Sequence, residues 1–299
     1  MHEDEIDTDA ALVRRLIAAQ FPRWAALDVT PVVSSGTDNA MYRLGGEMAV
    51  RLPRHLAAAR QVDKEPRWLK VLAPHLPLAI PAPLARGAPG GDFPLPWSVC
   101  RWLDGETAEH VADRRRMASE LAAFLVALRK IDTREAPAPG KHNFWRGVPL
   151  AQRDPVTQGA ILALKGEIDT RAVTAAWARD MNAPLWRGAP VWIHGDLSAG
   201  NLLAKDGRLC AVIDFGGLAV GDPACDLIVA WSLFDAEARA AFREGLTADD
   251  AMWARGRGWA LSVALVALPH YRDSNPAIAA GARRIIAAVL GDHRGLPSP

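Results

Sequence analysis

The sequence has few cysteines, almost no net charge and no long apolar run. Its 3 cysteines have no metal-binding spacing, and their odd number argues against a disulfide framework. With 35 basic and 34 acidic residues the net charge is +1, so no surface for nucleic acid or lipid is indicated. No apolar stretch could span a bilayer, and the beginning, MHEDEIDTDA, is acidic where a signal peptide is basic and then apolar. We expect a cytoplasmic protein that binds small molecules, without nucleic acid, membrane or an obligate protein partner.

A hydrophobic fraction of 50% over 299 residues predicts a globular chain with a substantial core, built as one large domain or as two lobes. Apolar residues at helical spacing predict helices over 9–21, 56–73, 113–131, 155–168, 170–181, 236–243, 252–268 and 276–290. Alternating or short apolar runs predict strands over 29–33, 40–44, 48–52 and 97–103. Helices and strands together indicate a mixed fold, and there is no internal repeat.

The most informative stretch is 191–226, VWIHGDLSAGNLLAKDGRLCAVIDFGGLAVGDPACD. A short apolar run ends in His-Gly followed by Asp196, and Asn201 stands where the chain becomes apolar again. Asp206-Gly207 then has the composition of a tight β-hairpin turn, and the returning strand ends at Asp214. Two carboxylates and an amide are thereby expected at strand ends around one hairpin.

That arrangement suits phosphoryl transfer. The reaction needs a hydroxyl aligned with the γ-phosphate and divalent cations on the phosphate oxygens. Asp196 can accept the hydroxyl proton, while Asn201 and Asp214 offer the hard oxygen ligands that Mg²⁺ prefers. Taken singly, Asp206 or Asp222 would be a turn or cap residue, and an isolated Asp-Phe-Gly is common, but three polar residues in this order at strand ends are not explained by turns. We interpret His194 as a structural residue of the loop, without a chemical step.

The spacing H-x-D-L-x-x-x-N followed by D-F-G resembles the catalytic and metal loops of protein kinases, except that Gly195 stands where they have arginine. HGDL-x-x-GN with IDFG and GDP-x-x-DL resembles the aminoglycoside phosphotransferase family of small-molecule kinases. The resemblance implies an α+β, two-lobed, protein-kinase-like fold: a small antiparallel-sheet lobe at 1–102, a larger, mostly helical lobe at 103–299, and nucleotide between them. The missing arginine and the short link from Gly216 to Asp222 argue against control by loop phosphorylation.

Two features of the first lobe are expected to contact phosphates. The loop 34–39, with Ser35, Gly36, Thr37 and Asn39, would cover them with backbone N–H groups, although these are also ordinary turn residues. Arg51 lies in a strand that matches V-A-I-K of the kinase pattern with arginine in place of lysine. A guanidinium binds phosphate well, so we expect Arg51 to do so, the alternative being an exposed strand arginine.

The resemblance would pair Arg51 with Glu65 in the helical stretch 56–73. Pro66 disfavours helical geometry at the residue before it, so the helix is expected to be kinked or restarted at Glu65. The alternative for this glutamate is a surface acid.

The resemblance also implies contacts made by the backbone. In CRWLDG, at the end of the first lobe, the carbonyl of Arg101 and the amide of Leu103 would meet the adenine-type base, while Trp102 could be core packing alone. Asp226 would accept hydrogen bonds from the backbone of the HGD loop, which is a structural role.

The expected enzyme is a Mg²⁺-dependent kinase that moves the γ-phosphate of ATP or GTP to a hydroxyl of a small molecule, with an aminoglycoside or another antibiotic, and hence antibiotic resistance, among the candidates. A polycationic acceptor requires carboxylates, for which Asp235, Asp249 and Asp250 are candidates. The competing hypothesis is a non-catalytic nucleotide-binding module, motivated by Arg51 in place of lysine and by Pro66. A phosphohydrolase is disfavoured because no His/Asp cluster suits a two-metal site.

Overall fold

The computed structural model describes residues 6–32 and 38–295, and its internal contacts divide the chain into two compact units. The first consists of residues 1–108 and 200–216, the second of 109–199 and 217–299. The segment 200–216 belongs to the first unit because its strand pairs with Ala79: the N–H of Ala79 donates to the carbonyl of Cys210 (3.1 Å), and that of Val212 donates to the carbonyl of Ala79 (2.9 Å). These units are not contiguous in sequence, unlike the two expected lobes. The expected lobe limits, 1–102 and 103–299, stay a prediction.

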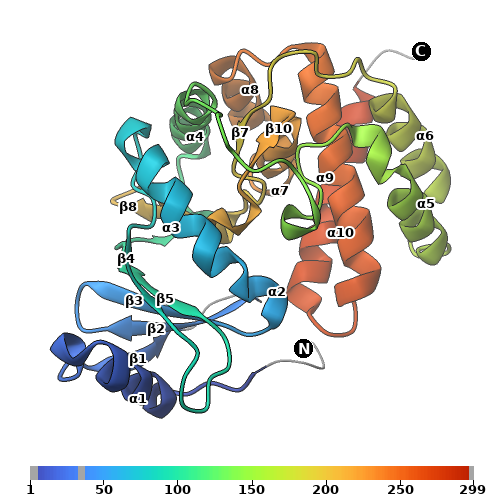
Figure 1. Ribbon diagram of the computed structural model, residues 1–299. Helices are drawn as coiled ribbons and strands as arrows, with labels where there is room; N and C mark the ends of the chain where they lie inside the picture. The colour runs from blue at the N-terminus through green and yellow to red at the C-terminus, as the bar shows by residue number, and fades with distance from the viewer. Residues whose placement is uncertain (1–5, 33–37, 296–299) are drawn as a thin grey trace. The chain divides into compact units, whose positions relative to one another are not determined.

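The first unit is built on a five-stranded antiparallel sheet in the order β1-β2-β3-β5-β4. Its strands are β1 (Val29–Val32), β2 (Asn39–Leu44), β3 (Met48–Pro53), β4 (Pro83–Gly87) and β5 (Trp97–Arg101). Helix α1 (Ala10–Gln20) begins at Asp9, whose carboxylate accepts from the N–H of Leu12 at 2.6 Å. The apolar face of α1 packs with β1, β2, β3 and β5 in one core, and Figure 1 shows it beside β1.

The predicted helix 56–73 is two helices, α2 (Leu56–Ala59) and α3 (Gln61–Leu72). The break lies at Arg60, so the expectation of a restart at Glu65 is wrong, while the expected kink there stays a prediction. Pro66 sits inside α3 and removes one N–H from it. The helix nevertheless continues, because a buried apolar face on both sides of Pro66, including Val62 and Leu69, holds it in place.

A second, three-stranded sheet of the first unit has the order β6-β8-β9, from β6 (Glu106–Thr107), β8 (Leu202–Lys205) and β9 (Arg208–Val212). Its hairpin turn is Asp206-Gly207, with φ of 51° and 74°. Positive φ at both central residues is what a type I′ turn requires, so the predicted Asp-Gly hairpin is confirmed. The hairpin sets Asn201 before one strand and Asp214 after the other.

The second unit is mostly helical. Its helices are α4 (Arg114–Arg129), α5 (Asp154–Ala163), α6 (Thr170–Met181), α7 (Val229–Ser232), α8 (Ala236–Gly245), α9 (Asp250–Tyr271) and α10 (Pro276–Arg294). Helices α9 and α10 run side by side (Figure 1). The predicted periodicities are confirmed, although α5 ends early, ahead of Gly166 at φ 90°. No helix within 6–32 and 38–295 has the length and hydropathy needed to cross a bilayer.

Candidate active site

The HGD loop follows β7 (Val191–Ile193), which pairs in an antiparallel two-stranded sheet with β10 (Ala219–Gly221). The backbone N–H groups of His194 and Gly195 donate to the two carboxylate oxygens of Asp226, at 3.0 and 2.7 Å. Asp226 is fully buried, one turn into a 3-10 helix (Pro223–Ile228) that begins at Asp222. The expected structural role of Asp226 is confirmed: it fixes the turn that follows the strand.

A half-buried arginine, Arg129, lies near this carboxylate. Burial lowers the pKa of Arg129, and the charge of Asp226 opposes that effect. For Asp226 itself, burial raises the pKa although two backbone N–H groups and Arg129 favour the charged form. The HGD loop is therefore held by a buried carboxylate whose charge a nearby guanidinium compensates. Removing either charge is costly, because the remaining one stays desolvated and unpaired.

Two further contacts hold the loop. The Nδ1 atom of the buried His194 accepts a hydrogen bond from the N–H of Asp196 at 3.2 Å, in keeping with a structural role for this histidine. Gly195 has φ of 83°, and a Cβ there would overlap the carbonyl oxygen of Gly217. Glycine is thus required by both the conformation and the space. Asp196 itself is exposed at the end of its strand, where it can meet a ligand.

The two candidate metal ligands lie together at the ends of the β8–β9 hairpin in the first unit. The N–H of Ile213 donates to the carbonyl of Asn201 at 2.9 Å, so Asn201 lies opposite the residue that precedes Asp214. Asp214 has a left-handed backbone with φ of 63°, and both side chains are half-buried. Aspartate tolerates that conformation better than most residues, and non-glycine residues that adopt it cluster at functional sites as well as in turns.

These two residues fit a Mg²⁺ ion. Mg²⁺ is commonly held by one or two protein oxygens together with substrate phosphates and water, which is the donor set of one carboxylate and one amide. Among the described residues there is no group of three or more His, Cys, Asp or Glu side chains that could hold a metal by itself.

Arg51 and Glu65 form a buried ion pair from β3 to α3. Both guanidinium Nη atoms donate to the carboxylate, Nη2 to Oε1 at 3.3 Å, and the residues are only 8% and 5% exposed. Burial by itself would lower the pKa of Arg51, but Glu65, with Asp214 among smaller contributors, raises it. The predicted pairing exists despite Pro66, and the alternatives of an exposed strand arginine and a surface acid are wrong.

Lys64 is a residue of the same region that the sequence interpretation missed. Its ammonium donates to the carbonyl of Gly216, the last residue of the Asp-Phe-Gly motif. Burial lowers the pKa of Lys64 to about 8, against the opposing charges of Glu65 and Asp214. Its only signal in the sequence is its position next to Glu65, which does not predict a contact 152 positions away.

The remaining predicted nucleotide contacts are placed as follows. Leu103 follows β5 closely, and its backbone N–H has no hydrogen-bond partner in the part of the chain that the structure describes. Arg101 ends β5 opposite Met48, and Asn39 begins β2. The other members of the predicted phosphate loop, Ser35, Gly36 and Thr37, lie outside the described residues.

Comparison with known proteins gives the class and the family. Similar solved structures include the GDP complex of a mutant aminoglycoside 2'-phosphotransferase-IIIa, with 19% identity, TM-score 0.77, and coverage of 96% of this chain and 99% of that one. The GDP and kanamycin complex of APH(2″)-IIIa has 18% identity, TM-score 0.75, and coverage of 94% and 99%. A macrolide 2'-phosphotransferase from Brachybacterium faecium has 20% identity, TM-score 0.63, and coverage of 97% and 99%. The fold is the two-lobed, kinase-like α+β fold.

The model of the phosphotransferase enzyme family matches residues 29–259, so the chain belongs to that family. The match includes the HGD loop, the hairpin and the Asp-Phe-Gly motif, the segments from which the site was built. No curated protein sequence matches the chain.

Proposed function

We propose that this phosphotransferase moves the γ-phosphate of ATP or GTP to a hydroxyl group of a small molecule. The observation that carries the proposal is the exposed Asp196 at the end of β7, in a turn fixed by two backbone hydrogen bonds to the buried Asp226. A carboxylate held in this way is preorganised to orient a hydroxyl and accept its proton. The family match and the GDP-bound and ADP-bound structures of similar fold support a nucleotide as the donor.

The first unit would bind the donor. Arg51, oriented by Glu65, would contact the phosphates, and the phosphate loop that includes Asn39 would cover them. The Leu103 N–H and the Arg101 carbonyl would meet the base. When Mg²⁺ is bound, it would neutralise the developing charge on the phosphate oxygens.

Asn201 and Asp214 would hold that ion, and their positions at the two ends of one hairpin support this assignment. Lys64, through the Gly216 carbonyl, would keep the segment after Asp214 in place. Gly217, which directly follows this segment, contacts Gly195 of the HGD loop.

The acceptor would be a hydroxylated small molecule. Solved structures of the same fold include a kanamycin complex and a macrolide 2'-phosphotransferase, so antibiotics form the first set to test. We infer the cytoplasm as the compartment, because nucleoside triphosphates are abundant there. The test is a turnover screen with γ-labelled ATP and GTP, with and without Mg²⁺, over hydroxylated antibiotics and metabolites. Label transferred to an acceptor supports the proposal. Nucleotide binding without transfer to any acceptor favours the non-catalytic module.

A further inference from the structure

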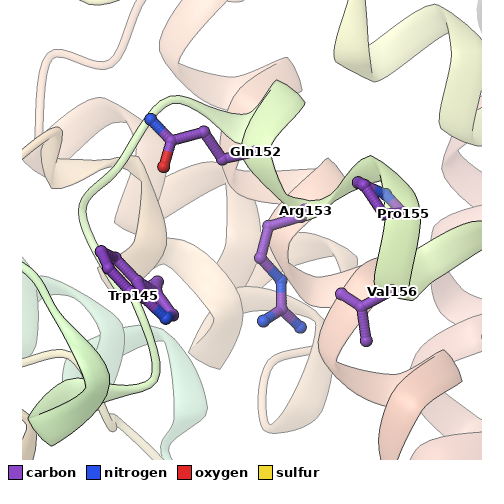
Figure 2. A pocket seen from close by; sticks show the side chains of 5 residues that line it. All are labelled: Trp145, Gln152, Arg153, Pro155 and Val156. Atoms are coloured by element: carbon purple, nitrogen blue, oxygen red, sulfur yellow. The ribbon is translucent and has the colours of Figure 1, made fainter.

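A cavity of about 380 Å³ opens in the second unit, outside the residues assigned so far. It is lined by Trp145, Gln152, Arg153, Pro155 and Val156, and Figure 2 shows the Arg153 guanidinium pointing into the space between Trp145 and Val156. A cavity of this size is in the range that holds small ligands.

The Arg153 guanidinium of the cavity meets a second one, that of Arg146, at the ring of Trp259, without a carboxylate. The guanidinium groups of Arg153 and Arg146 lie 5.4 and 5.8 Å from the ring centroid of the buried Trp259. Arg153 donates from Nε to the hydroxyl of Ser262 at 3.2 Å, and neither arginine forms an ion pair within the described residues. Burial and then the charge of Arg146 lower the pKa of Arg153 to about 10, with no acid to offset them.

The other buried arginines nearby are paired. On α9, the helix that also carries Trp259, Arg255 contacts Asp222 at 2.7 Å and Arg257 contacts Asp180 at 2.6 Å. A half-buried guanidinium that serves packing alone is expected to have such a partner, because a desolvated charge is costly when it stays unpaired. The Arg153 guanidinium at the cavity, with that of Arg146 over the same indole ring, therefore forms a preformed site for an anion.

The acids close to the cavity do not neutralise the charge of the Arg153 guanidinium. Asp154, next to Arg153, accepts hydrogen bonds from Trp177 (2.7 Å) and Gln158 (3.1 Å). The three acids considered for binding a polycationic acceptor serve other purposes. Asp235 and Asp249 are helix N-caps and accept backbone hydrogen bonds at 2.9 and 2.6 Å, and Asp250 pairs with an arginine.

The aromatic wall is held in an uncommon backbone conformation. Phe144 and Trp145 have φ of 53° and 60°, and both side chains are exposed, at 70% and 48%. Two successive left-handed residues are costly unless the surroundings impose them. The result is a tryptophan face that a flat or apolar group can cover.

The wall is also tied to the HGD loop. Asn143 donates from Nδ2 to the carbonyl of Gly217 at 3.3 Å, and Gly217 in turn contacts Gly195. Gly147 packs so closely on Ile193 of β7 that a Cβ there would clash. The segment that carries Trp145 of the cavity wall is thus held by contacts with the strand and loop that carry Asp196.

We propose that this cavity binds the acceptor, and that the acceptor carries an anionic oxygen group, which Arg153 binds and the nearby charge of Arg146 favours, beside a flat apolar part that packs on Trp145. The inference rests on the proposed function, since it names the substrate class. It excludes a polycationic amino sugar as the preferred acceptor, because its ammonium groups would face the Arg153 guanidinium and the nearby charge of Arg146.

The test uses four benzyl alcohols that differ only in the para group: carboxylate, phosphate, methyl ester and aminomethyl. Their affinities for the full chain are measured by ligand-observed NMR without nucleotide, so the result does not depend on phosphate transfer. We expect an anionic probe to bind at least about tenfold more tightly than the ester, the effect of one charge-assisted contact, and the aminomethyl probe to bind most weakly. Whichever of the carboxylate and the phosphate binds more tightly identifies the anionic group.

Variants locate the effect. Arg153→Gln should weaken the anionic probes about tenfold or more and leave the ester unchanged, while Arg153→Lys, which keeps the charge, should retain part of the affinity. Arg171→Gln is the matched control, because Arg171 is an exposed arginine of α6 and should change nothing. Circular dichroism checks that each variant is folded.

The proposal is overturned if the aminomethyl probe binds as tightly as the anionic ones. It is also overturned if Arg153→Gln leaves their affinities within twofold of wild type. If the anionic probes bind as expected but no acceptor is phosphorylated, the pocket stands and the proposed function fails. If phosphate is transferred to cationic acceptors and the anionic probes do not bind, the proposed function stands and the anion-binding pocket is refuted.

Discussion

The buried pair of Arg51 and Glu65 allows a quantitative test of the first unit. Replacing Glu65 with leucine leaves the Arg51 guanidinium buried, at 8% exposure, without its carboxylate. Breaking such a pair by removing one partner costs about 3–5 kcal/mol, whereas replacing both partners with apolar residues is close to neutral. We therefore expect Glu65→Leu to lower the free energy of unfolding by about 3–5 kcal/mol. The double variant Arg51→Met/Glu65→Leu should recover most of that loss.

The control lies two positions away on the same helix. Asp63 pairs with Arg86 at 2.5 Å, but the two side chains are 62% and 48% exposed, and such pairs contribute about 0–1 kcal/mol. Urea unfolding of wild type, Glu65→Leu, Asp63→Ala and the double variant compares the four free energies directly. If Glu65→Leu costs no more than Asp63→Ala, or if the double variant is less stable than Glu65→Leu, the reasoning about the buried pair is refuted.

Three other outcomes are expected. Asp214→Asn should abolish Mg²⁺-dependent nucleotide binding, measured by calorimetry with and without the ion, because it removes the charged ligand; unchanged metal dependence would exclude Asp214. Gly195→Ala should reduce activity strongly because its Cβ meets Gly217, while Gly207→Ala, with positive φ but open space, should cost only about 1–2 kcal/mol of stability and keep activity; equal activities would contradict this. Of the three thiols, the half-buried Cys210 should react first with iodoacetamide in the native protein, since burial raises the pKa of all three but shields only Cys100 and Cys225 from the reagent, and labelling of a buried thiol first would argue against the packing.

Local chemistry explains what the sequence predicted well. The turn at Asp206-Gly207 follows from the positive φ that these residues tolerate, and the helices follow from apolar periodicity. Once the hairpin is placed, Asn201 and Asp214 must lie near its two ends. The role of Asp226 was available only through the resemblance, because a hydrogen bond across 31 positions leaves no local pattern.

Tertiary packing explains what the sequence did not show. Pro66 predicted a break that packing of α3 suppresses, and the break falls at Arg60, where no local signal marks it. The contact of Lys64 with Gly216 joins segments far apart in the chain. Arg153 lies in a stretch without regular period, so its meeting with Arg146 over one indole ring could not be read from spacing.

The central claim is that Asp196 acts on the acceptor hydroxyl and not on the nucleotide. Asp196→Asn keeps the shape of the side chain and removes the base, in a turn whose hydrogen bonds come from the backbone. On the acceptor found by the turnover screen, we expect transfer to fall by about 10²–10⁴ while the nucleotide Kd stays within about twofold of wild type. Transfer at the wild-type rate, with nucleotide binding intact in both proteins, would contradict the account and leave a nucleotide-binding module in its place.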